Sequence, residues 1–579
     1  MKYKMLFFIV ATFLCSCNKL DLNPLSEGSS ENWYENETEI QMAVLKLFNI
    51  DYWDAALTRI ASGSGGYSHQ WTEAFTDNWT ARATLTEIDG ATINSQTSFV
   101  NITWQNAYRC IAAANRVIMN MDRARGTVSD DKLELYEANS RFARASQFAR
   151  LIFYYGDVPY YTGILSIDEA FDMSRTPKAQ VLDSVYADYD YAIAHLPTSY
   201  GAGNYQLATK GAALALKGRI ALYMGDYAIA RDALEDCIQL GVYSLYPDYG
   251  KLFLSSTKNS QETIFANPRS VDLGVELPPS GRAKEPLPRI VGGFANGGPS
   301  WDLLCSYLCT DGLPIDKSPL FDPHDPFKNR DPRCDETIVP FGSQWLGFVY
   351  QPHPDSLKTL NLNTGGLVAN SDNRAVDQYA SYNGLVWKKG IDEDWLDLKT
   401  DPDNIVIRYA DVLLMYAEAK IELNDIDPSV LDAINQVRAR AYKVDYKDVS
   451  SYPAVTTTNQ GELRTILREE RRMEFAFEGT RYADLIRWHL AGKALNNHPI
   501  YGMLDPGDLR TKVVDKGLWF FPSKPDIDVD GLPDFTKMYE AGQIKLLVQR
   551  KFDTTKQYLW PIPATEIEIN PNMSQNEGY

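Results

Sequence analysis

Residues 213–240 carry the pattern that most constrains the fold. Gly218 and Gly225 are seven residues apart, and Gly225 is followed by Asp226-Tyr227. A glycine inside a helix lets a second helix approach closely, and a glycine at a helix end permits the turn that follows. The segment therefore predicts two short helices that pack closely against each other, with a turn at Gly225.

The same spacing is typical of a tetratricopeptide helix pair, and helical patterns also occur upstream of it. Residues 107–121 and 134–155 are two further candidates, and apolar residues recur at helical spacing over 182–196, after a Thr176-Pro177 start. Proline at the first helical position costs no hydrogen bond. Because one helix pair cannot bury its apolar face alone, we expect several units to stack over residues 31–260.

The character of the sequence changes over residues 261–400. Glycine and proline cluster there, and tryptophans are scattered among them. These residues break helices, so we expect a loop-rich insertion with some strand, held by the helical scaffold. Helices return in residues 401–579, with one over 409–423 and one over 462–477. The first has a polar face formed by Asp411, Glu418 and Glu422.

The N-terminus has the form of an export signal. Lys2 and Lys4 precede an apolar run over residues 5–14, which ends in Leu14-Cys15-Ser16-Cys17. This predicts a signal peptide over 1–16, lipid attachment at Cys17 and a polar tether over 17–30. The alternative is an ordinary signal peptide with an incidental cysteine. No later stretch has eighteen uninterrupted apolar residues.

Charge and cysteine content exclude some functions. The chain has 57 basic and 76 acidic residues, a net charge of −19, which argues against nucleic acid as a partner. Cys305 and Cys309 could form half of a metal site, but without a second such pair they are better interpreted as buried thiols. By contrast, 12 Trp, 34 Tyr and 23 Phe exceed what a helical core needs.

No catalytic residue can be assigned from the motifs. The acidic run Glu469, Glu470, Glu474 and Glu478 could hold a glycosidase acid and nucleophile, but basic residues at helical neighbour spacing are expected to pair with each acid. The basic residues are Arg468, Arg471, Arg472 and Arg481. The six histidines form no metal-binding motif. Asp401-Pro-Asp403 and Asp425-Ile-Asp427 are weak candidates for structural calcium, and polar helix boundaries are the favoured interpretation.

Several longer segments resemble the SusD/RagB family of outer-membrane nutrient-binding lipoproteins. They include Arg408-Tyr-Ala-Asp-Val-Leu-Leu-Met-Tyr-Ala-Glu-Ala419, Leu467-Arg-Glu-Glu-Arg-Arg-Met-Glu-Phe-Ala-Phe-Glu-Gly479 and Pro561-Ile-Pro563. The resemblance implies a mainly α fold, with tetratricopeptide-like helix pairs packed against an irregular, loop-rich ligand-binding region with minor β structure. It also implies a protein that does no chemistry, needs no cofactor and faces the cell exterior from the outer membrane.

The resemblance further implies a ligand and a partner. Family members capture oligosaccharides, or in some branches peptides, and sit over a TonB-dependent transporter of the SusC type. Sugar rings stack on flat aromatic side chains, and their hydroxyls need polar partners. On that basis two segments, 67–82 and 296–301, are predicted to form the site. The residues placed there are Tyr67, Trp71, Asp77, Asn78, Trp79, Arg82 and Trp301, with Trp345 and Tyr350 as the next candidates.

Other interpretations stay open from the sequence. The same rings could pack the loops onto the helical body, as is expected for Trp104, Trp488 and Trp560. For the whole chain, glycan binding and delivery to the transporter is the preferred hypothesis. The alternatives are peptide capture, a secreted glycoside hydrolase, and a purely structural tetratricopeptide scaffold.

Overall fold

The computed structural model describes residues 33–54, 73–82, 86–201, 207–276, 284–397 and 399–579. The predicted signal peptide, Cys17, the whole tether over 17–30, Tyr67 and Trp71 lie outside these residues. The larger helices are α2 (Glu37–Lys46), α5 (Ser98–Asn120), α6 (Asp130–Tyr155), α8 (Lys178–His195), α9 (Lys210–Met224), α10 (Tyr227–Gln239), α13 (Tyr409–Glu422), α14 (Pro428–Ala441) and α15 (Gln460–Glu474).

Short helices connect or follow these. They are α3 (Ile50–Asp54), α4 (Thr86–Asp89), α7 (Ile167–Phe171), α11 (Trp301–Ser306), α12 (Arg333–Thr337), α16 (Arg481–Arg487), α17 (Ala491–Leu495), α18 (Pro506–Lys512), α19 (Thr536–Glu540) and α20 (Ala564–Ile569). The mainly α class expected from the sequence is thereby confirmed.

The strands are short and form small antiparallel sheets. Four sheets have two strands: β1 (Trp79–Ala81) with β3 (Gly297–Pro299), β2 (Thr263–Asn267) with β8 (Asn404–Arg408), β9 (Pro499–Gly502) with β12 (Lys545–Gln549), and β10 (Asp526–Ile527) with β11 (Pro533–Asp534). The fifth has the order β4 (Gln344–Trp345), β5 (Phe348–Val349), β6 (Lys358–Asn361) and β7 (Gly366–Ala369).

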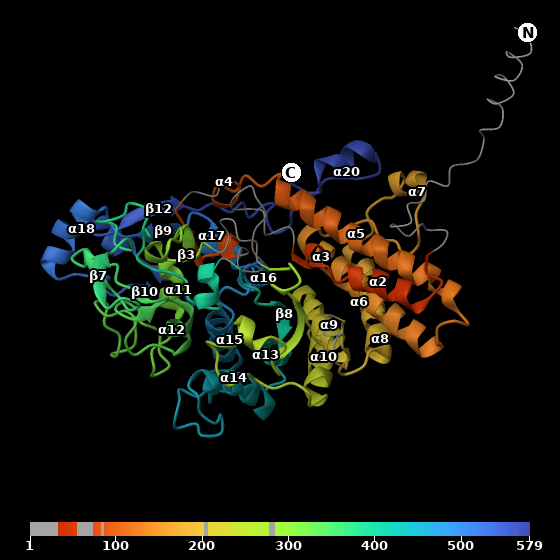
Figure 1. Cartoon of the computed structure of the whole chain (residues 1–579), viewed down its shortest axis with the longest axis horizontal. Helices are drawn as coiled ribbons and strands as arrows, with labels where there is room; N and C mark the ends of the chain where they lie inside the picture. The colour runs from red at the N-terminus through yellow and green to blue at the C-terminus, as the bar shows by residue number, and fades with distance from the viewer. Residues whose placement is uncertain (1–32, 55–72, 83–85, 202–206, 277–283, 398) are drawn as a thin grey trace, which may run out of the picture.

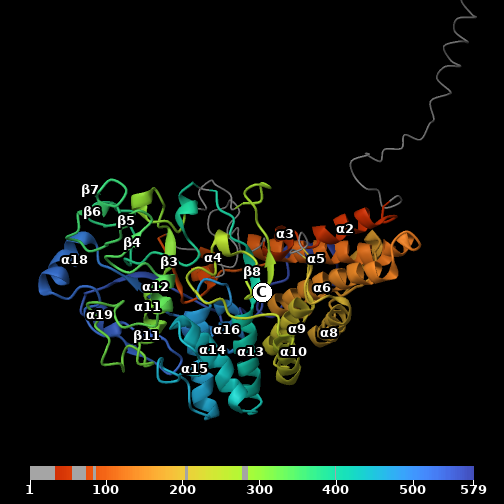
Figure 2. The same cartoon turned by 60° about the horizontal axis from the view of Figure 1, so that its bottom comes forward.

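The predicted helix pair around Gly225 is α9 and α10. Gly225 ends α9 in the left-handed conformation, with φ 87°, which glycine adopts without strain. Gly218 lies where a Cβ atom would come within 2.5 Å of Leu234 Cγ, so only glycine lets the two helices approach this closely. Figures 1 and 2 show α5, α6, α8, α9 and α10 stacked at one end of the molecule, and the β4–β7 sheet at the other.

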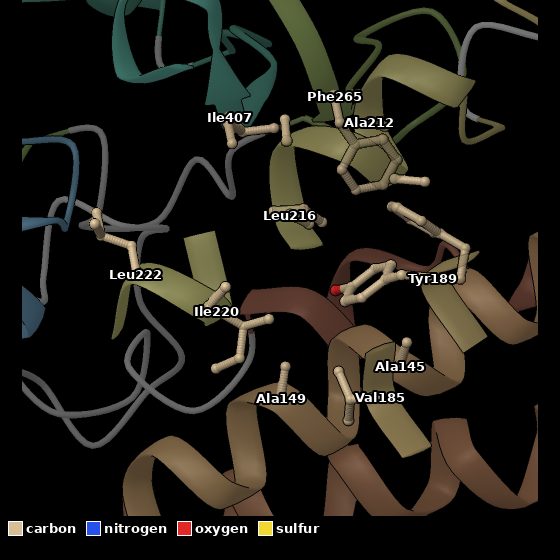
Figure 3. Close-up of a cluster of buried hydrophobic side chains, with 14 of the residues drawn as sticks. Ala145, Ala149, Val185, Tyr189, Ala212, Leu216, Ile220, Leu222, Phe265 and Ile407 are labelled. Carbon is tan, nitrogen blue, oxygen red and sulfur yellow. The ribbon is translucent and has the colours of Figure 1, made fainter. Parts of the chain in front are cut away.

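The main core joins this stack to the C-terminal half of the chain. Ala149 of α6, Tyr189 of α8, Leu216 of α9 and Ile407 of β8 belong to one buried cluster, part of which is shown in Figure 3. Phe265 of β2 lies in the same cluster and contacts Phe142 edge to face, with ring centroids 5.3 Å apart. The helical stack and the strands that follow it therefore share a hydrophobic core.

Helix α13 lies at the centre of the molecule and is buried on every side, which corrects its interpretation as an amphipathic helix. All residues from Tyr409 to Ile421 are buried, including Asp411 and Glu418, two of the three acids assigned to its polar face, while Glu422 is half-buried. Asp411 accepts hydrogen bonds from Arg219 (2.7 Å) and Arg471 (2.8 Å). Glu418 is paired with Arg487. The acids mark contacts with other helices instead of solvent.

A second hydrophobic core lies in the loop-rich half. It contains Trp79, Trp301, Trp387, Phe477 and Phe521, and further aromatic residues pack around them. The five cysteines of the described residues are buried and free, as expected for Cys305 and Cys309. Within the same residues, no helix is long and apolar enough to cross a bilayer.

Residues 560–579 return to the N-terminal helices. Trp560 is buried and stacks on Tyr154 of α6, with centroids 4.3 Å apart. Asn576 donates to the carbonyl oxygens of Tyr155 (2.9 Å) and Trp560 (2.7 Å), and accepts from Arg175 (2.5 Å). The end of α6 is thus covered by a segment that lies more than 400 residues later in the chain.

Candidate functional site

The two segments predicted to form the site lie side by side. Strand β1 pairs with β3, so that Trp79 lies opposite Pro299 and Ala81 opposite Gly297. Beyond the strands, the Arg82 amide donates to the Asn296 carbonyl oxygen (2.8 Å), and the Ser300 amide donates to the Asn78 carbonyl oxygen (2.9 Å). A third segment joins them, because Asn383 donates its side-chain amide to Pro299 (2.7 Å).

Asp77 and Asn78, which directly precede β1, are fully buried. The Asp77 carboxylate accepts from Arg481 through both oxygens, at 2.9 and 2.8 Å, and contacts Arg472 at 2.9 Å. Burial alone would raise the pKa of Asp77, but Arg472 and Arg481 lower it well below its usual range. Asn78 accepts from Arg472 Nε at 2.9 Å. Both side chains are occupied by protein contacts.

Trp79 is also enclosed, with 2% of its surface exposed. Its ring meets Trp387 and Phe477 edge to face, at centroid distances of 6.4 and 6.0 Å. Gly297 lies so close to the ring that a Cβ atom there would overlap it. Gly297, in the glycine-rich segment before Trp301, therefore leaves the space that the Trp79 ring occupies in the core.

Trp301 and Tyr350 likewise belong to the interior. Trp301 is 1% exposed, donates Nε1–H to the Asn383 carbonyl oxygen (2.9 Å), and contacts Phe520 and Phe521 edge to face. Tyr350 is 2% exposed and donates to Gly384 (2.8 Å). Such rings present no face to a sugar, so the predicted ligand contact of Trp79, Trp301 and Tyr350 is not supported. The structure favours the packing role that the sequence left open.

The remaining predicted residues differ from one another. Trp345, in β4, is half-buried beside Val339, Tyr350 and Val386. Arg82 is half-buried at the surface end of β1, and its Nη1 donates to the carbonyl oxygens of Phe294 (2.8 Å) and Tyr379 (3.0 Å). Of the predicted set within the described residues, Arg82 and Trp345 are the two that retain accessible surface.

An exposed ring that was not predicted from the sequence lies next to Arg82. Tyr379 is 48% exposed, and the guanidinium carbons of Arg82 and Arg289 lie 5.0 and 5.8 Å from its ring centroid. Arg289 is held by Asp377, with Nε and Oδ2 3.0 Å apart. Tyr379 stands in a segment without a repeated pattern, so its position beside β1 could not be read from spacing. An aromatic face flanked by hydrogen-bond donors is the chemistry that sugar binding requires.

A cavity of about 230 Å³ opens on the other side of Arg82. It lies between β1 and β12, and its polar lining includes Thr80, Arg82, Tyr382 and Lys545. Arg374 lies over the Tyr382 ring, with its guanidinium carbon 4.4 Å from the ring centroid. Arg82 both lines the cavity and lies over the Tyr379 ring, so we treat the exposed ring and the cavity as one candidate surface. We call this surface, defined by Arg82, Arg289, Tyr379, Tyr382 and Lys545, the tyrosine platform.

The acidic run on α15 is largely paired, but not by its neighbours on the helix. Glu470 contacts Arg333 (2.7 Å) and Arg438 (2.8 Å), and Glu474 contacts Arg333 (3.0 Å) and Arg408 (2.7 Å). These cations come from other elements. The expected pairing with Arg468, Arg471, Arg472 and Arg481 is therefore wrong in its partners.

Two further acids of the run differ in their environment. Glu478, beyond the end of α15, contacts Lys389 (2.6 Å) and Arg408 (2.7 Å). Glu469 has no ion pair among the described residues, and burial raises its pKa to about 7. The expectation that every acid of the run is paired therefore fails at Glu469.

The two weak calcium candidates are occupied by protein groups. Asp401 contacts Lys258 (2.9 Å), and Asp403 accepts from the Arg269 amide (3.0 Å). Asp427 caps α14 by accepting from the Ser429 amide (2.9 Å) and pairs with Lys420 (2.6 Å). The contacts of Asp427 are those of a polar helix boundary, as expected, whereas Asp401 and Asp403 lie just before strand β8, so that interpretation is wrong for them. Across the described ranges, no group of three metal-ligating side chains is found.

Two models of known protein families match most of the chain. Residues 261–579 match the model described as the SusD family. Residues 32–222 match a second model, described as starch-binding and associating with the outer membrane. The match over 32–222 ends within α9 and the match over 261–579 begins just before β2, so together they cover the helical stack apart from α10, and the half that carries β3, Tyr379 and β12.

Individual proteins are similar over nearly their whole length. SusD-like protein P2 of Formosa agariphila is 24% identical, with both chains fully covered. The crystal structure of a SusD-like carbohydrate-binding protein from Bacteroides fragilis has a TM-score of 0.75 at 28% identity, over 93% of this chain and 99% of that one. Surface glycan-binding protein A from Bacteroides thetaiotaomicron shares the fold, with a TM-score of 0.62 at 17% identity over 94% and 100%.

Proposed function

Because this chain belongs to the SusD family, we propose that it is a glycan-binding protein of the outer membrane that captures oligosaccharides and passes them to a SusC-type transporter. The tyrosine platform is the observation that carries the proposal. Tyr379 offers an exposed ring, and the guanidinium groups of Arg82 and Arg289 lie over it, with their carbons 5.0 and 5.8 Å from its centroid. The names of the similar proteins, which refer to carbohydrate and glycan binding, support the same ligand class.

Ligand binding without chemistry is part of the proposal. A glycoside hydrolase needs two carboxyl groups facing a cleft, one of them able to donate a proton. Glu469 has the raised pKa of a proton donor. Glu470, Glu474 and Glu478 are engaged with arginine or lysine, so the run leaves Glu469 without a second free carboxylate. Purified protein incubated with polysaccharide should therefore release no shorter products on chromatography. Product release by the wild type would support the hydrolase alternative.

The anchor and the partner are inferred from the sequence and the family. A lipid on Cys17 and the tether over 17–30 would hold the folded body close to a transporter in the same membrane. Replacing Cys17 with Ala should move the protein from the membrane fraction to the soluble fraction, and lipid labelling of the variant would contradict the assignment. Co-purification of a TonB-dependent transporter with the wild type tests the partner.

The test of the platform compares two exposed rings. In affinity gels, Tyr379→Ala should bind the polysaccharide that retards the wild type about tenfold more weakly. This corresponds to a loss of about 1.4 kcal/mol in binding free energy. Phe171→Ala is the matched control, because Phe171 is 44% exposed but lies on α7, in the helical stack. Equal affinity of Tyr379→Ala and wild type would remove the platform from the binding site. Retention of peptides but not of glycans would favour the peptide-capture alternative.

A further inference from the structure

A groove of about 630 Å³ lies on a different part of the molecule. One wall is formed by residues 243–248, which follow α10, and the other by the end of α14 and residues 443–446. Its volume is within the range of ordinary ligand sites. Figure 1 shows α10 and α14 along the lower edge, whereas β3 and β12 of the tyrosine platform lie in the upper left. The groove is therefore separate from the platform.

Three tyrosine rings line this groove. Tyr243 and Tyr409 lie with ring centroids 6.4 Å apart and planes tilted by 33°, and Tyr446 comes from the opposite wall. Leu245 and Val444 add further apolar surface. Tyr243 is fixed in place because its hydroxyl lies 3.1 Å from Thr209 Oγ1. The groove thus offers preformed aromatic surface, as a stacked sugar ring requires.

Polar groups in the groove are available for hydrogen bonding. The side chains of Gln436 and Tyr446, which line the groove, make no hydrogen bond to any other described residue. A tyrosine hydroxyl both donates and accepts, and a glutamine amide does the same through two atoms. This is the set of partners that matches the hydroxyl groups of a sugar, each of which is also both donor and acceptor.

The charged groups of the groove are largely balanced. Lys443 contacts Asp248 across the rim, with Nζ and Oδ2 3.3 Å apart. The Arg440 guanidinium is turned to the interior, where it pairs with Glu262 and Glu474. The ligand that fits is therefore uncharged and rich in hydroxyl groups. We propose that this groove is a second glycan-binding site, which holds a neutral oligosaccharide segment on the half-buried Tyr243 and Tyr446 rings.

A second site changes how a long polymer is held. When one polysaccharide chain reaches both sites, the second contact is intramolecular, and overall binding is tighter than at either site alone. The inference rests on the proposed glycan-binding function but makes a separate prediction. Loss of the tyrosine platform should leave some polymer binding, and this remaining binding should depend on the groove.

Affinity gels containing laminarin, starch, xyloglucan or arabinoxylan test this prediction. In a polymer that retards the wild type, Tyr379→Ala should remain partly retarded, and adding Gln436→Ala and Tyr446→Ala should abolish the retardation. Val242→Ala is the control, because Val242 is 47% exposed and precedes Tyr243 without lining the groove. Complete loss of retardation in Tyr379→Ala, or no added effect of the groove variants, would overturn the second site and leave the first intact.

Hydrogen exchange provides a readout that does not depend on a substitution. Saturating the wild type with the retarding polysaccharide should slow amide exchange in residues 243–248 and 440–447. Unchanged amide exchange in these residues would overturn the groove assignment. The assignment would also be overturned if a tryptic digest of casein slowed exchange there and none of the polysaccharides did. If none of the four polymers retards or protects the wild type, the proposed function fails for neutral glycans, and the second site fails with it.

Discussion

Arg481 grips Asp77 with two parallel hydrogen bonds, Nε to Oδ1 at 2.9 Å and Nη2 to Oδ2 at 2.8 Å. The two residues are 404 positions apart, and both are buried. Asp77 also contacts Arg472 at 2.9 Å. This cluster fastens the segment before β1 to helices α15 and α16, and so places the tyrosine platform on the C-terminal half.

Replacing Asp77 with Asn should destabilise the protein by about 3–5 kcal/mol. The substitution preserves shape but leaves two buried guanidinium groups without their carboxylate, which is the costly way to break a buried pair. Urea denaturation at neutral pH measures the change. Asp526→Asn is the control, because Asp526 pairs with Lys537 at an exposed position and its loss should leave the midpoint unchanged. Similar midpoints for the two variants would show that the Asp77 cluster does not hold the fold.

Trp301→Ala should lower the free energy of unfolding by about 3–5 kcal/mol, since it removes a fully buried ring from a well-packed aromatic cluster. Thermal or urea unfolding detects this loss. Leu273→Ala, at a position 81% exposed, should change stability by less than about 0.5 kcal/mol. A Trp301 variant with wild-type stability and weakened glycan binding would restore the ligand role predicted from the sequence.

Gly218→Ala should destabilise the helical stack by about 1–3 kcal/mol, because the new methyl group would overlap Leu234 across the α9–α10 contact. Gly507→Ala provides the opposite case. A Cβ atom there meets nothing within 4 Å, so the substitution should be neutral or stabilise by about 0.4–1 kcal/mol. Differential scanning calorimetry of both variants tests the pair, and a destabilisation shared equally by both would contradict the close-packing argument.

The pH dependence of stability should contain a component from Asp372, beside the platform. Burial raises the pKa of this carboxyl to about 7, although it accepts hydrogen bonds from the amides of Arg289 (2.6 Å) and Ile290 (3.3 Å). An unfolded aspartate has a pKa of about 3.9. The folded state therefore binds more protons between pH 4 and 7, and stability from this group is present below pH 4 and lost as the pH rises through 7.

Asp372→Asn removes that titration and tests its sign. Urea denaturation at pH 4.5, 6.0 and 7.5 should show that the variant loses less stability than the wild type as the pH rises across this range. Val529→Ala, at a non-titrating position that is 80% exposed, should leave the wild-type slope unchanged. An identical slope for Asp372→Asn and wild type would mean that Asp372 titrates normally in the folded protein.

Helices whose signals are local could be predicted from the sequence. The ends of α8 and the turn at Gly225 follow from proline, glycine and apolar spacing within one segment. The role of α13 could not be predicted in this way. A polar stripe containing Asp411 and Glu418 looks the same whether it faces water or buried arginines, and the arginines come from α9, α15 and α16.

The candidate site shows the same limit. The segments 79–81 and 297–299 pair as strands, so the two regions that the sequence places in one site lie side by side. The first is identified by its rings and hydrogen-bonding side chains, and the second by a ring in glycine-rich backbone. Which ring faces outward depends on contacts between distant segments. The Trp79 ring is buried because Gly297 leaves space for it, and the Trp301 ring is buried against Phe520 and Phe521. Tyr379 remains at the surface next to Arg82.

The contacts of Asn576 set an order of events for folding after synthesis. The carbonyl oxygen of Tyr155, at the end of α6, receives its side-chain partner from Asn576, and Tyr154 is covered by Trp560. Contacts so distant in sequence form late, since closing a long loop costs chain entropy before any contact is gained. A chain that emerges N-terminus first must therefore keep the α6 end exposed until residue 576 arrives, and chaperone protection is most needed during that interval.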